Sequence, residues 1–317
     1  MAAPEALNNN NASSPRLLRP QDHLRPFQLP NHTNHENGHP DNAGDIPPLP
    51  TVIAHIHARV QAFLSETHPP GSLLASVQRQ TRTSLEVVST ALSRYSLSEL
   101  SVSYNGGKDC LVMVILFLAG LHPYPPPSAN TDDTSQALKS AAATVIPSIY
   151  ALPPDPFPAV EDFVISSARA FHLSITKYTT APPASTLRSS FEDYLHRHPG
   201  IRAIFVGTRR TDPHGAQLTH FDRTDGGWPD FVRVHPVIDW HYSEIWAFIR
   251  HLGLCYCELY DQGYTSLGGT SDTYPNPRLK VDGDPNGDGV GGCAAGEQQY
   301  LPAYNLTEDV EERLGRN

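Results

Sequence analysis

Cysteines and long apolar runs are what this sequence most clearly lacks. Its four cysteines are too few for a disulfide scaffold, and their spacing matches no zinc motif: Cys110, Cys255, Cys257 and Cys293. No run of about 18 apolar residues is present, which excludes a membrane-spanning helix, and no apolar segment of the secretory type opens the chain. We therefore expect a cytoplasmic protein in a reducing compartment, without a membrane partner.

Positive charge is also scarce. The 23 Lys and Arg residues are outnumbered by 33 Asp and Glu residues, which gives a net charge of −10 with histidine neutral. A surface that binds nucleic acid broadly is basic, so this balance argues against a nucleic-acid partner. An anionic ligand would need cations that are gathered at one place in the fold. We expect a monomer whose partners are small molecules.

Residues 1–50 show no hydrophobic periodicity. They contain the run Asn8–Asn11 and several prolines, which is typical of a disordered tail. The three arginines of this stretch are compatible with a mitochondrial transit peptide, but Glu5 and Asp22 are atypical of one. A plain tail is the preferred interpretation, and the folded domain is expected to span residues 51–317.

Helix-like and strand-like patterns alternate along the rest of the chain. Leu111, Val114 and Leu118, for example, recur on one helical face. The expected helices are 52–65, 72–95, 110–121, 159–171, 184–197 and 241–252, and the expected strands are 100–104, 143–151, 173–178 and 203–206. This alternation predicts an α/β fold, a Rossmann-like parallel sheet with helices on both faces. Loop insertions are expected at 122–140 and 280–295, and the C-terminal segment is expected to be irregular.

A glycine turn joins the first expected strand to its helix, in the segment Ser103–Asp109. Gly106 and Gly107 let the backbone turn tightly and approach a ligand without interference from a Cβ atom. The helix that follows offers free N–H groups and the positive end of its dipole, and Lys108 adds a cation. A cradle for a pyrophosphate group is therefore favoured over an ordinary turn. The segment is neither a P-loop nor a dinucleotide fingerprint.

Asp109 is unusual beside a bound anion. Its carboxylate would repel a phosphate unless a divalent cation lay between the two groups. Mg²⁺ is the natural candidate, because it is a hard cation that commonly bridges carboxylates and phosphates. The alternative interpretation is a helix N-cap, and the two interpretations are compatible.

Two further segments follow the fourth expected strand. In Gly207–Pro213, two arginines and one aspartate at a strand end suit a phosphate together with a metal or hydroxyl group. On spacing alone, a solvated loop explains this segment equally well. The segment Asp225–Pro236 combines aromatic and charged residues without a period, so it could stack a flat ring and hold a phosphate. In isolation, Trp228 and Phe231 fit a place in the core better than a ligand site.

Together these segments resemble eukaryotic FAD synthetase, the FMN adenylyltransferase of the ATP-pyrophosphatase-loop superfamily. The resemblance is carried by four segments: Ser103–Cys110, Gly207–Pro213, Trp228–Trp240 and Leu259–Leu279. It extends over about residues 52–317, outside the two insertions. The stretch Pro236–Gly268 is also similar to phosphoadenylyl-sulfate reductases. The Asn-Gly-Gly turn, however, is closer to the FAD synthetase form than to the Ser-Gly-Gly form of the reductases.

The resemblance implies a set of site residues. Catalytic roles fall to Asn105, Asp109, Asp212, Arg313 and Arg316. Contacts with ATP and FMN fall to Ser103, Tyr104, Gly106, Gly107, Lys108, Gly207, Arg209, Arg210, Asp225, Trp228, Asp230 and Arg233, of which the last four are on the flavin side. Mg²⁺ is assigned to Asp109 and Asp212. Without the resemblance, the two C-terminal arginines would be interpreted as partners of Asp309 and Glu312 in helical ion pairs.

The implied reaction is adenylyl transfer from ATP to FMN, which gives FAD and pyrophosphate. It needs no protein nucleophile and no obligatory general base, because the FMN phosphate is already an anion, so positioning and charge neutralisation carry the catalysis. A sulfonucleotide reductase is the first alternative. It requires a reactive C-terminal cysteine, and Cys293 lies in a glycine-rich insert without a basic neighbour. A non-catalytic flavin- or nucleotide-binding protein is the second alternative.

Overall fold

The computed structural model describes residues 46–124, 145–181, 185–281 and 299–317. Most of the expected N-terminal tail and of the two expected insertions lies outside these ranges, so these predictions stay untested. No described helix combines the length and the apolar character that a membrane crossing requires.

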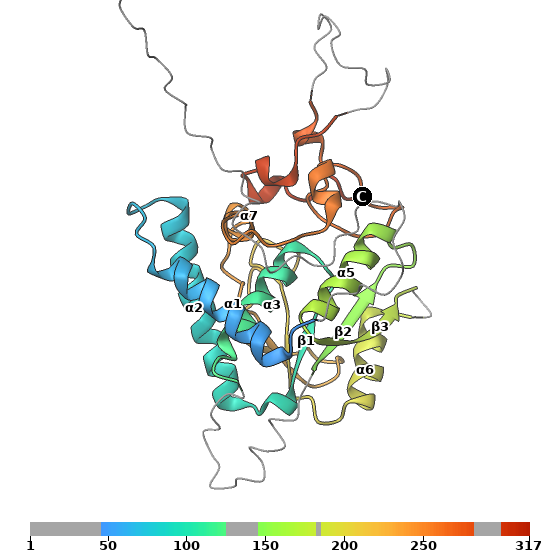
Figure 1. The fold of residues 1–317 in the computed structure, drawn as a ribbon. Coiled ribbons are helices and arrows are strands. Elements are labelled where there is room, and N and C mark those ends of the chain that lie inside the picture. The colour runs from blue at the N-terminus through green and yellow to red at the C-terminus, as the bar shows by residue number, and fades with distance from the viewer. Residues whose placement is uncertain (1–45, 125–144, 182–184, 282–298) are drawn as a thin grey trace, which may run out of the picture.

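A six-stranded sheet forms the centre of the fold, with the strand order β3-β2-β1-β4-β6-β5 (Figure 1). The strands are β1 (Leu100–Ser103), β2 (Ile146–Leu152), β3 (Leu173–Thr179), β4 (Ala203–Phe205), β5 (Phe221–Arg223) and β6 (Val232–Val234). Neighbouring strands are parallel except β5, which runs antiparallel to β6 at one edge. The strand order switches direction between β1 and β4. At such a point the connections that leave the two carboxyl ends diverge, and a crevice remains between them.

Helices cover both faces of this sheet (Figure 1). They are α1 (Leu49–Ser65), α2 (Leu73–Arg94), α3 (Lys108–Gly120), α5 (Pro158–Ala170), α6 (Leu187–Arg197) and α7 (Tyr242–His251). Buried side chains of α1, α2, α3, α5 and α7 form the main core, which includes Tyr150 of β2. Its neighbour Ile149 belongs instead to a separate cluster with Phe191 and Tyr194 of α6. Because successive side chains of a strand point to opposite faces, α6 covers the face opposite to the main core.

The fold class predicted from the sequence is confirmed, with one correction at the sheet edge. The expected strands and helices are present, and their ends differ from the prediction by up to three residues. The sequence pattern does not predict β5 and β6, and β5 makes the sheet mixed instead of fully parallel. Each of these strands has three residues, which is too short for an alternation of period two to stand out.

The C-terminal segment is irregular, as the sequence predicts. After α7, the described residues form isolated β-bridges and short 3₁₀ turns: η3 (Glu258–Gln262), η4 (Pro277–Leu279), η5 (Ala303–Asn305) and η6 (Asp309–Glu311). A further short turn, η2 (Leu97–Glu99), leads into β1. In Figure 1 this orange and red segment lies beside α5 and α7, at one end of the sheet.

Helix α3 is buried on all sides. Every residue from Leu111 to Ala119 is buried, and α3 contacts α1, α2 and α7. A helix that is apolar all round belongs in a core, where close packing fixes its position. Its first residue, Lys108, directly follows the glycine turn, so the core holds that turn in place. Near the other end, Gly120 packs against α2, and a Cβ atom there would lie 2.5 Å from Val88 Cγ1.

We predict that Gly120→Ala lowers the free energy of unfolding by about 1–3 kcal/mol, because the added methyl group must displace the buried and β-branched Val88. The midpoint of denaturant unfolding measures this change. Gly226→Ala is the matched control, since nothing lies within 4 Å of its added Cβ atom. Val88→Ala in the same chain should recover part of the loss. Strictly additive losses would contradict the contact.

Candidate active site

The glycine turn between β1 and α3 has the strand–turn–helix geometry that the sequence predicts. Gly106 adopts a φ of +72°, and a Cβ atom there would lie 2.8 Å from Val164 Cγ2, so both backbone and packing require glycine. Asn105 Oδ1 accepts a hydrogen bond from Gly107 N at 2.9 Å, which closes the turn. Gly107 is the N-cap of α3. The positive end of the α3 dipole therefore lies at the carboxyl edge of the sheet.

The segment that follows β4 lies directly against this turn. A Cβ atom on Gly207 would stand 2.8 Å from Cys110 Sγ and 2.9 Å from the Cys110 backbone, so glycine is needed for this close approach. Because β1 and β4 are adjacent parallel strands, their carboxyl ends meet at the switch in strand order. The two glycine segments that the sequence singles out thus form the two walls of one crevice.

A cavity of about 390 Å³ occupies this crevice. Its volume is in the range of small-molecule sites. Nine of the predicted site residues line it: Ser103, Asn105, Gly107, Lys108, Asp109, Gly207, Asp212, Arg313 and Arg316. The remaining lining comes mainly from the connection after β2, from Tyr260 and from residues 266–268. Tyr260 is a lining residue that the sequence pattern does not predict, and its hydroxyl accepts the N–H of Lys108 at 3.0 Å. The only sequence signal for Tyr260 is its position in Leu259–Leu279, one of the segments that resemble FAD synthetase.

Two predicted substrate contacts are turned away from the cavity. The Tyr104 side chain is buried, and its hydroxyl donates to Ser167 Oγ of α5 at 2.8 Å. Arg210 donates from Nε to Asp239 Oδ1 at 2.7 Å, and it does not line the cavity. Both side chains therefore have partners within the protein, and the structure favours a structural role for them over contact with ATP.

The residues predicted on the flavin side lie around the connection between β5 and β6: Asp225, Trp228, Asp230 and Arg233. Val232, the first residue of β6, pairs with Ala203, the first residue of β4, so β6 starts at the amino end of the parallel strands. Trp228 packs edge-on against Phe191 of α6, with ring centroids 6.3 Å apart. None of the four residues lines the cavity, and their contact with a flavin stays a prediction.

Arg209 is the centre of a buried ion cluster. Its side chain is 0% exposed, and Nε lies 2.9 Å from Asp109 Oδ1. Its two Nη atoms contact three further carboxylates, those of Glu312, Asp309 at 3.4 Å and Asp212 at 3.5 Å. These acids belong to the start of α3, the segment after β4 and the C-terminal segment. Arg209 therefore ties three separate parts of the chain together behind the crevice.

Lys108 belongs to the same cluster. Its side chain is buried, and Nζ donates to Asp109 Oδ2 at 2.9 Å and to Glu312 Oε1. The prediction that Lys108 and Arg209 contact phosphate stays a prediction. Both cations are buried and held by carboxylates, so they position the turn, and Lys108 also lines the cavity.

The charges of this cluster keep one another ionised. Burial alone would raise the pKa of Asp109, but the neighbouring Arg209 and Lys108 outweigh it and hold this pKa below its ordinary value. Burial alone would lower the pKa of Lys108, but Asp109 and Glu312 raise it. The pKa of Arg209 is raised in the same way, against the effect of its burial. Asp109, Lys108 and Arg209 are thus charged at neutral pH.

Asp109 and Asp212 have the chemistry that a phosphate-bound Mg²⁺ requires. Asp109 Oδ1 is buried and accepts no hydrogen bond from the described residues, although Arg209 Nε lies 2.9 Å from it as an ion-pair partner. The Asp212 side chain is 26% exposed, and its Oδ2 accepts the N–H of Arg209 at 2.8 Å. Mg²⁺ usually takes one or two carboxylates and fills its other positions with phosphate oxygens and water. The two aspartates therefore fit the ion that the sequence analysis assigns to them.

The two C-terminal arginines reach the cavity in different ways. Arg313 is exposed and forms no ion pair with any described residue. Arg316 donates from Nη2 to Asp272 Oδ2 at 3.0 Å. Its guanidinium lies over Gly268, where a Cβ atom would stand 2.3 Å from Nη2. Asp272 and Gly268 thus hold Arg316 at the edge of the cavity, while Arg313 has no such restraint.

The helical ion pairs of the alternative interpretation are wrong. Asp309–Glu311 is a single 3₁₀ turn, so the spacing of an α-helix does not apply. Asp309 accepts the N–H of Tyr242 at 2.7 Å, at the start of α7, and contacts His241 Nδ1 at 2.6 Å. The pKa of His241 is raised by this contact. Glu312 turns inward, to Lys108 and Arg209.

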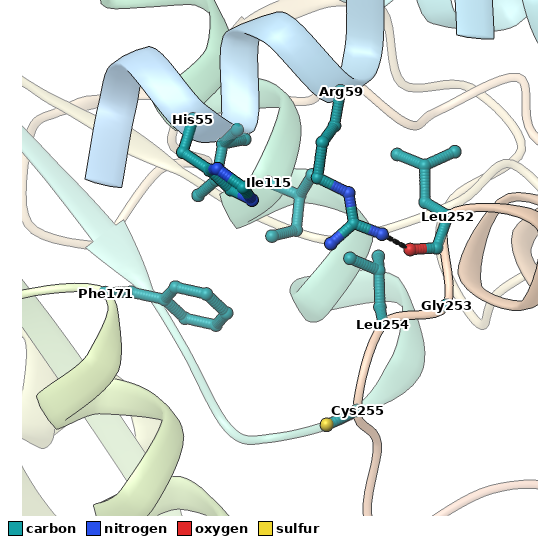
Figure 2. A pocket seen from close by; sticks show the side chains of 9 residues that line it. His55, Arg59, Ile115, Phe171, Leu252, Gly253, Leu254 and Cys255 are labelled. Carbon is teal, nitrogen blue, oxygen red and sulfur yellow. Dashed lines mark hydrogen bonds between the residues drawn. The ribbon is translucent and has the colours of Figure 1, made fainter. Parts of the chain in front are cut away.

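A second, much smaller cavity lies between α1, α3 and the segment after α7 (Figure 2). Its volume is about 20 Å³, enough for about one water molecule. Figure 2 shows Arg59 of α1 beside it, and the guanidinium of Arg59 donates to Leu252 O. This cavity is too small for a nucleotide, so the crevice is the candidate active site.

The chain is similar to a known domain and to a known enzyme family. The family model of the phosphoadenosine phosphosulfate reductase domain matches residues 99–275, so the chain carries a domain of this class. The "Probable FAD synthase" of Schizosaccharomyces pombe is 38% identical over 78% of this chain and 83% of its own length. The chain belongs to the FAD synthase family.

Two crystal structures of Candida glabrata FMN adenylyltransferase are similar to this chain. The complex with FMN and the ATP analogue AMPCPP has a TM-score of 0.72 and 28% identity, over 85% of this chain and 100% of that one. The complex with FAD and inorganic pyrophosphate has a TM-score of 0.73 and 27% identity, over 86% and 99%. The fold of the family therefore extends over most of this chain.

We predict that Lys108→Met and Glu312→Gln are coupled by about 1–3 kcal/mol in a double-mutant cycle, because each change alone leaves an uncompensated charge in the buried cluster. Each single variant should lose about 3 kcal/mol of stability, measured by denaturant unfolding. The exposed pair Arg188 and Glu192 is the control, and its coupling should stay below about 0.5 kcal/mol. A coupling of the same small size at Lys108 and Glu312 would show that the pair does not hold the turn.

Proposed function

We propose that the chain is an FMN adenylyltransferase, which converts ATP and FMN into FAD and pyrophosphate. The observation that carries the proposal is the crevice at the switch in strand order. It combines a glycine turn on a helix N-terminus, two carboxylates and two arginines around one cavity of about 390 Å³. Family membership supports the proposal, since the similar Candida glabrata enzyme binds FMN with an ATP analogue, and FAD with pyrophosphate.

The reaction requires the protein mainly to place the two substrates and to balance their negative charge. An oxygen of the FMN phosphate attacks the α-phosphorus of ATP, and a new P–O bond forms. The bond between the α-phosphorus and the oxygen bridging to the β-phosphate breaks, and pyrophosphate leaves with that electron pair. The attacking phosphate is already ionised, so no proton has to be removed. Catalysis consists of bringing two anions together and balancing the charge on the transferred phosphate.

The glycine turn and the first turn of α3 receive the triphosphate. Gly107 brings the backbone close to the phosphates, and the α3 dipole attracts them. Asn105 is exposed at the mouth of the cavity, where its amide can reach a ligand. Asp109 and Asp212 would hold Mg²⁺, which neutralises phosphate charge when it is bound. The buried cations behind the turn keep Asp109 ionised for this purpose.

The flavin side of the site rests on the resemblance alone. Trp228 is 37% exposed, so part of its ring is open to a ligand, whereas Arg233 lies 3.6 Å from Asp225. We retain these residues as flavin contacts in the proposal. A cytoplasmic location and a monomeric state belong to the proposal in the same way.

The cysteines do not favour a sulfonucleotide reductase. Of the described cysteines, Cys110 lines the cavity, and burial, together with the charge of Asp109, raises its pKa to about 12. Its thiol is therefore protonated at neutral pH, and the thiolate is the reactive form. Cys293 lies outside the described residues.

The proposal is tested by incubating the protein with ATP, MgCl₂ and FMN. FAD and pyrophosphate should form in equal amounts, measured by chromatography and by a coupled phosphate assay, and neither should form without FMN. Binding of FAD without any turnover would indicate a non-catalytic flavin-binding protein. Release of sulfite from phosphoadenylyl sulfate in the presence of thioredoxin would indicate a reductase. Either result overturns the proposal.

Arg313→Ala should lower kcat about 100-fold and leave KM for FMN within about threefold, because the exposed guanidinium acts on charge that develops at the transferred phosphate. Steady-state kinetics measure both constants. Arg197→Ala removes an exposed arginine from α6 and should change neither. Arg313→Lys should restore part of kcat. If Arg313→Ala turns over as fast as the unaltered enzyme, the assignment fails.

Asp272 should act as a positioning residue through Arg316. Asp272→Asn weakens the ion pair, and Gly268→Ala pushes the same guanidinium away from the other side. Both changes should lower kcat about tenfold, with little change in KM for FMN and in the melting temperature, because they misplace a charge without removing it. Arg197→Ala, on the exposed face of α6, is the control. Normal kcat in both variants would show that the place of Arg316 is irrelevant to turnover.

A further inference from the structure

A group of metal-ligating side chains lies away from the crevice, where the end of α1 meets the end of α7. Glu66 is the C-cap of α1, His68 follows two residues later, and His251 is the last residue of α7. One ligand atom from each residue lies within 4.8 Å of those of the other two. Within the described ranges of the chain, no other three His, Cys, Asp or Glu side chains meet this spacing.

The three groups already converge on one point. His68 Nε2 lies 2.9 Å from Glu66 Oε2, and His251 Nε2 lies 2.8 Å from the same oxygen. The two imidazole rings meet edge to face, with centroids 5.9 Å apart. A tetrahedral Zn²⁺ with bonds of about 2.0–2.2 Å keeps its ligand atoms about 3.4 Å apart. Ligand shifts of about half an ångström would therefore admit the ion in place of the two contacts.

The ligands are held by contacts that do not involve the ligand atoms. Gln78 Nε2 donates to Phe63 O at 2.7 Å and to Glu66 O at 2.9 Å, which fixes the backbone at the end of α1. The buried ring of Phe63 lies 4.9 Å from the ring of His251 and 6.2 Å from that of His68. The two rings therefore rest on a part of the core, and little side-chain freedom is left to lose when an ion binds.

A similar contact holds the end of α7. Arg59 of α1 donates to Leu252 O, directly after His251 (Figure 2). The helix that carries Glu66 and the helix that carries His251 are thus joined before any ion binds. The site is also accessible, because Glu66 is 40% and His251 29% exposed.

We propose that Glu66, His68 and His251 bind a late first-row divalent metal ion, of which Zn²⁺ is the representative. Two imidazoles and one carboxylate suit this class of ion, whereas Mg²⁺ and Ca²⁺ prefer sites built from oxygen alone. Three protein ligands leave a fourth position for water. The ion ties the end of α1 to the end of α7 and stabilises the folded state, because it binds that state in preference to the unfolded chain. The proposal is independent of the proposed function.

The test uses the tag-free full chain and Co²⁺ as a spectroscopic probe. One equivalent of Co²⁺ should give the visible d–d absorption of a four- or five-coordinate ion, and Zn²⁺ should abolish it by displacement. Excess MgCl₂ should not displace Co²⁺, which separates this site from the crevice. Saturating Zn²⁺ should raise the melting temperature by roughly 5 °C. No absorption and no thermal shift would overturn the proposal.

Single variants assign the ion to these residues. His68→Ala and His251→Ala should each weaken Co²⁺ binding at least about tenfold and remove the thermal shift. His196→Ala, which removes an exposed imidazole from α6, is the matched control and should change neither. Far-UV circular dichroism checks that each variant is folded. The chain also contains His23, His32, His35 and His39, which are alternative ligands for Co²⁺. Unchanged Co²⁺ affinity in both alanine variants would place the ion on other histidines and overturn the assignment.

Discussion

Two buried cations, Arg209 and Lys108, hold the site together, and the carboxylates that surround them offset the cost of burying their charges. Removing such groups from water is costly unless every charge finds a partner of good geometry. Glu312 is shared by both cations, although it follows Lys108 by 204 residues. The glycine turn after β1 is therefore not complete until the C-terminal segment has docked behind it. That segment is a structural part of the crevice and not an appendage to the α/β domain.

Two neighbouring residues of the C-terminal segment carry charges with different roles. Glu312 points into the protein and anchors the segment, and the next residue, Arg313, is exposed at the cavity. Glu312 therefore fixes the backbone position of Arg313, while the exposed side chain of Arg313 is free to move with a bound phosphate. Arg316 is restrained differently, by Asp272. Of the two arginines at the cavity, Arg313 is therefore the one whose charge no described acid balances.

The sequence predicts those features that depend on local pattern, and it misses those that depend on distant partners. The periodicity of α3 and the glycine turn before it are local, and both are confirmed by the structure. The two short strands at the sheet edge carry too few residues for a pattern. The burial of Lys108 and Arg209 could not be foreseen, because residue type and spacing do not reveal that Glu312 will face inward. For the same reason, local spacing wrongly paired Glu312 with Arg316 in a helix.

The charge of the crevice explains why a divalent cation belongs in the proposed reaction. Arg209 and Lys108 contact four carboxylates, so the cluster behind the cavity carries more negative than positive charge. Arg316 is already partly balanced by Asp272, which leaves Arg313 as the cation without an ion-pair partner among the described lining residues. One guanidinium cannot balance a triphosphate and a second phosphate brought into contact. In the proposed reaction, Asp109 and Asp212 would hold a Mg²⁺ ion, and its charge would offset the repulsion between these carboxylates and the phosphates.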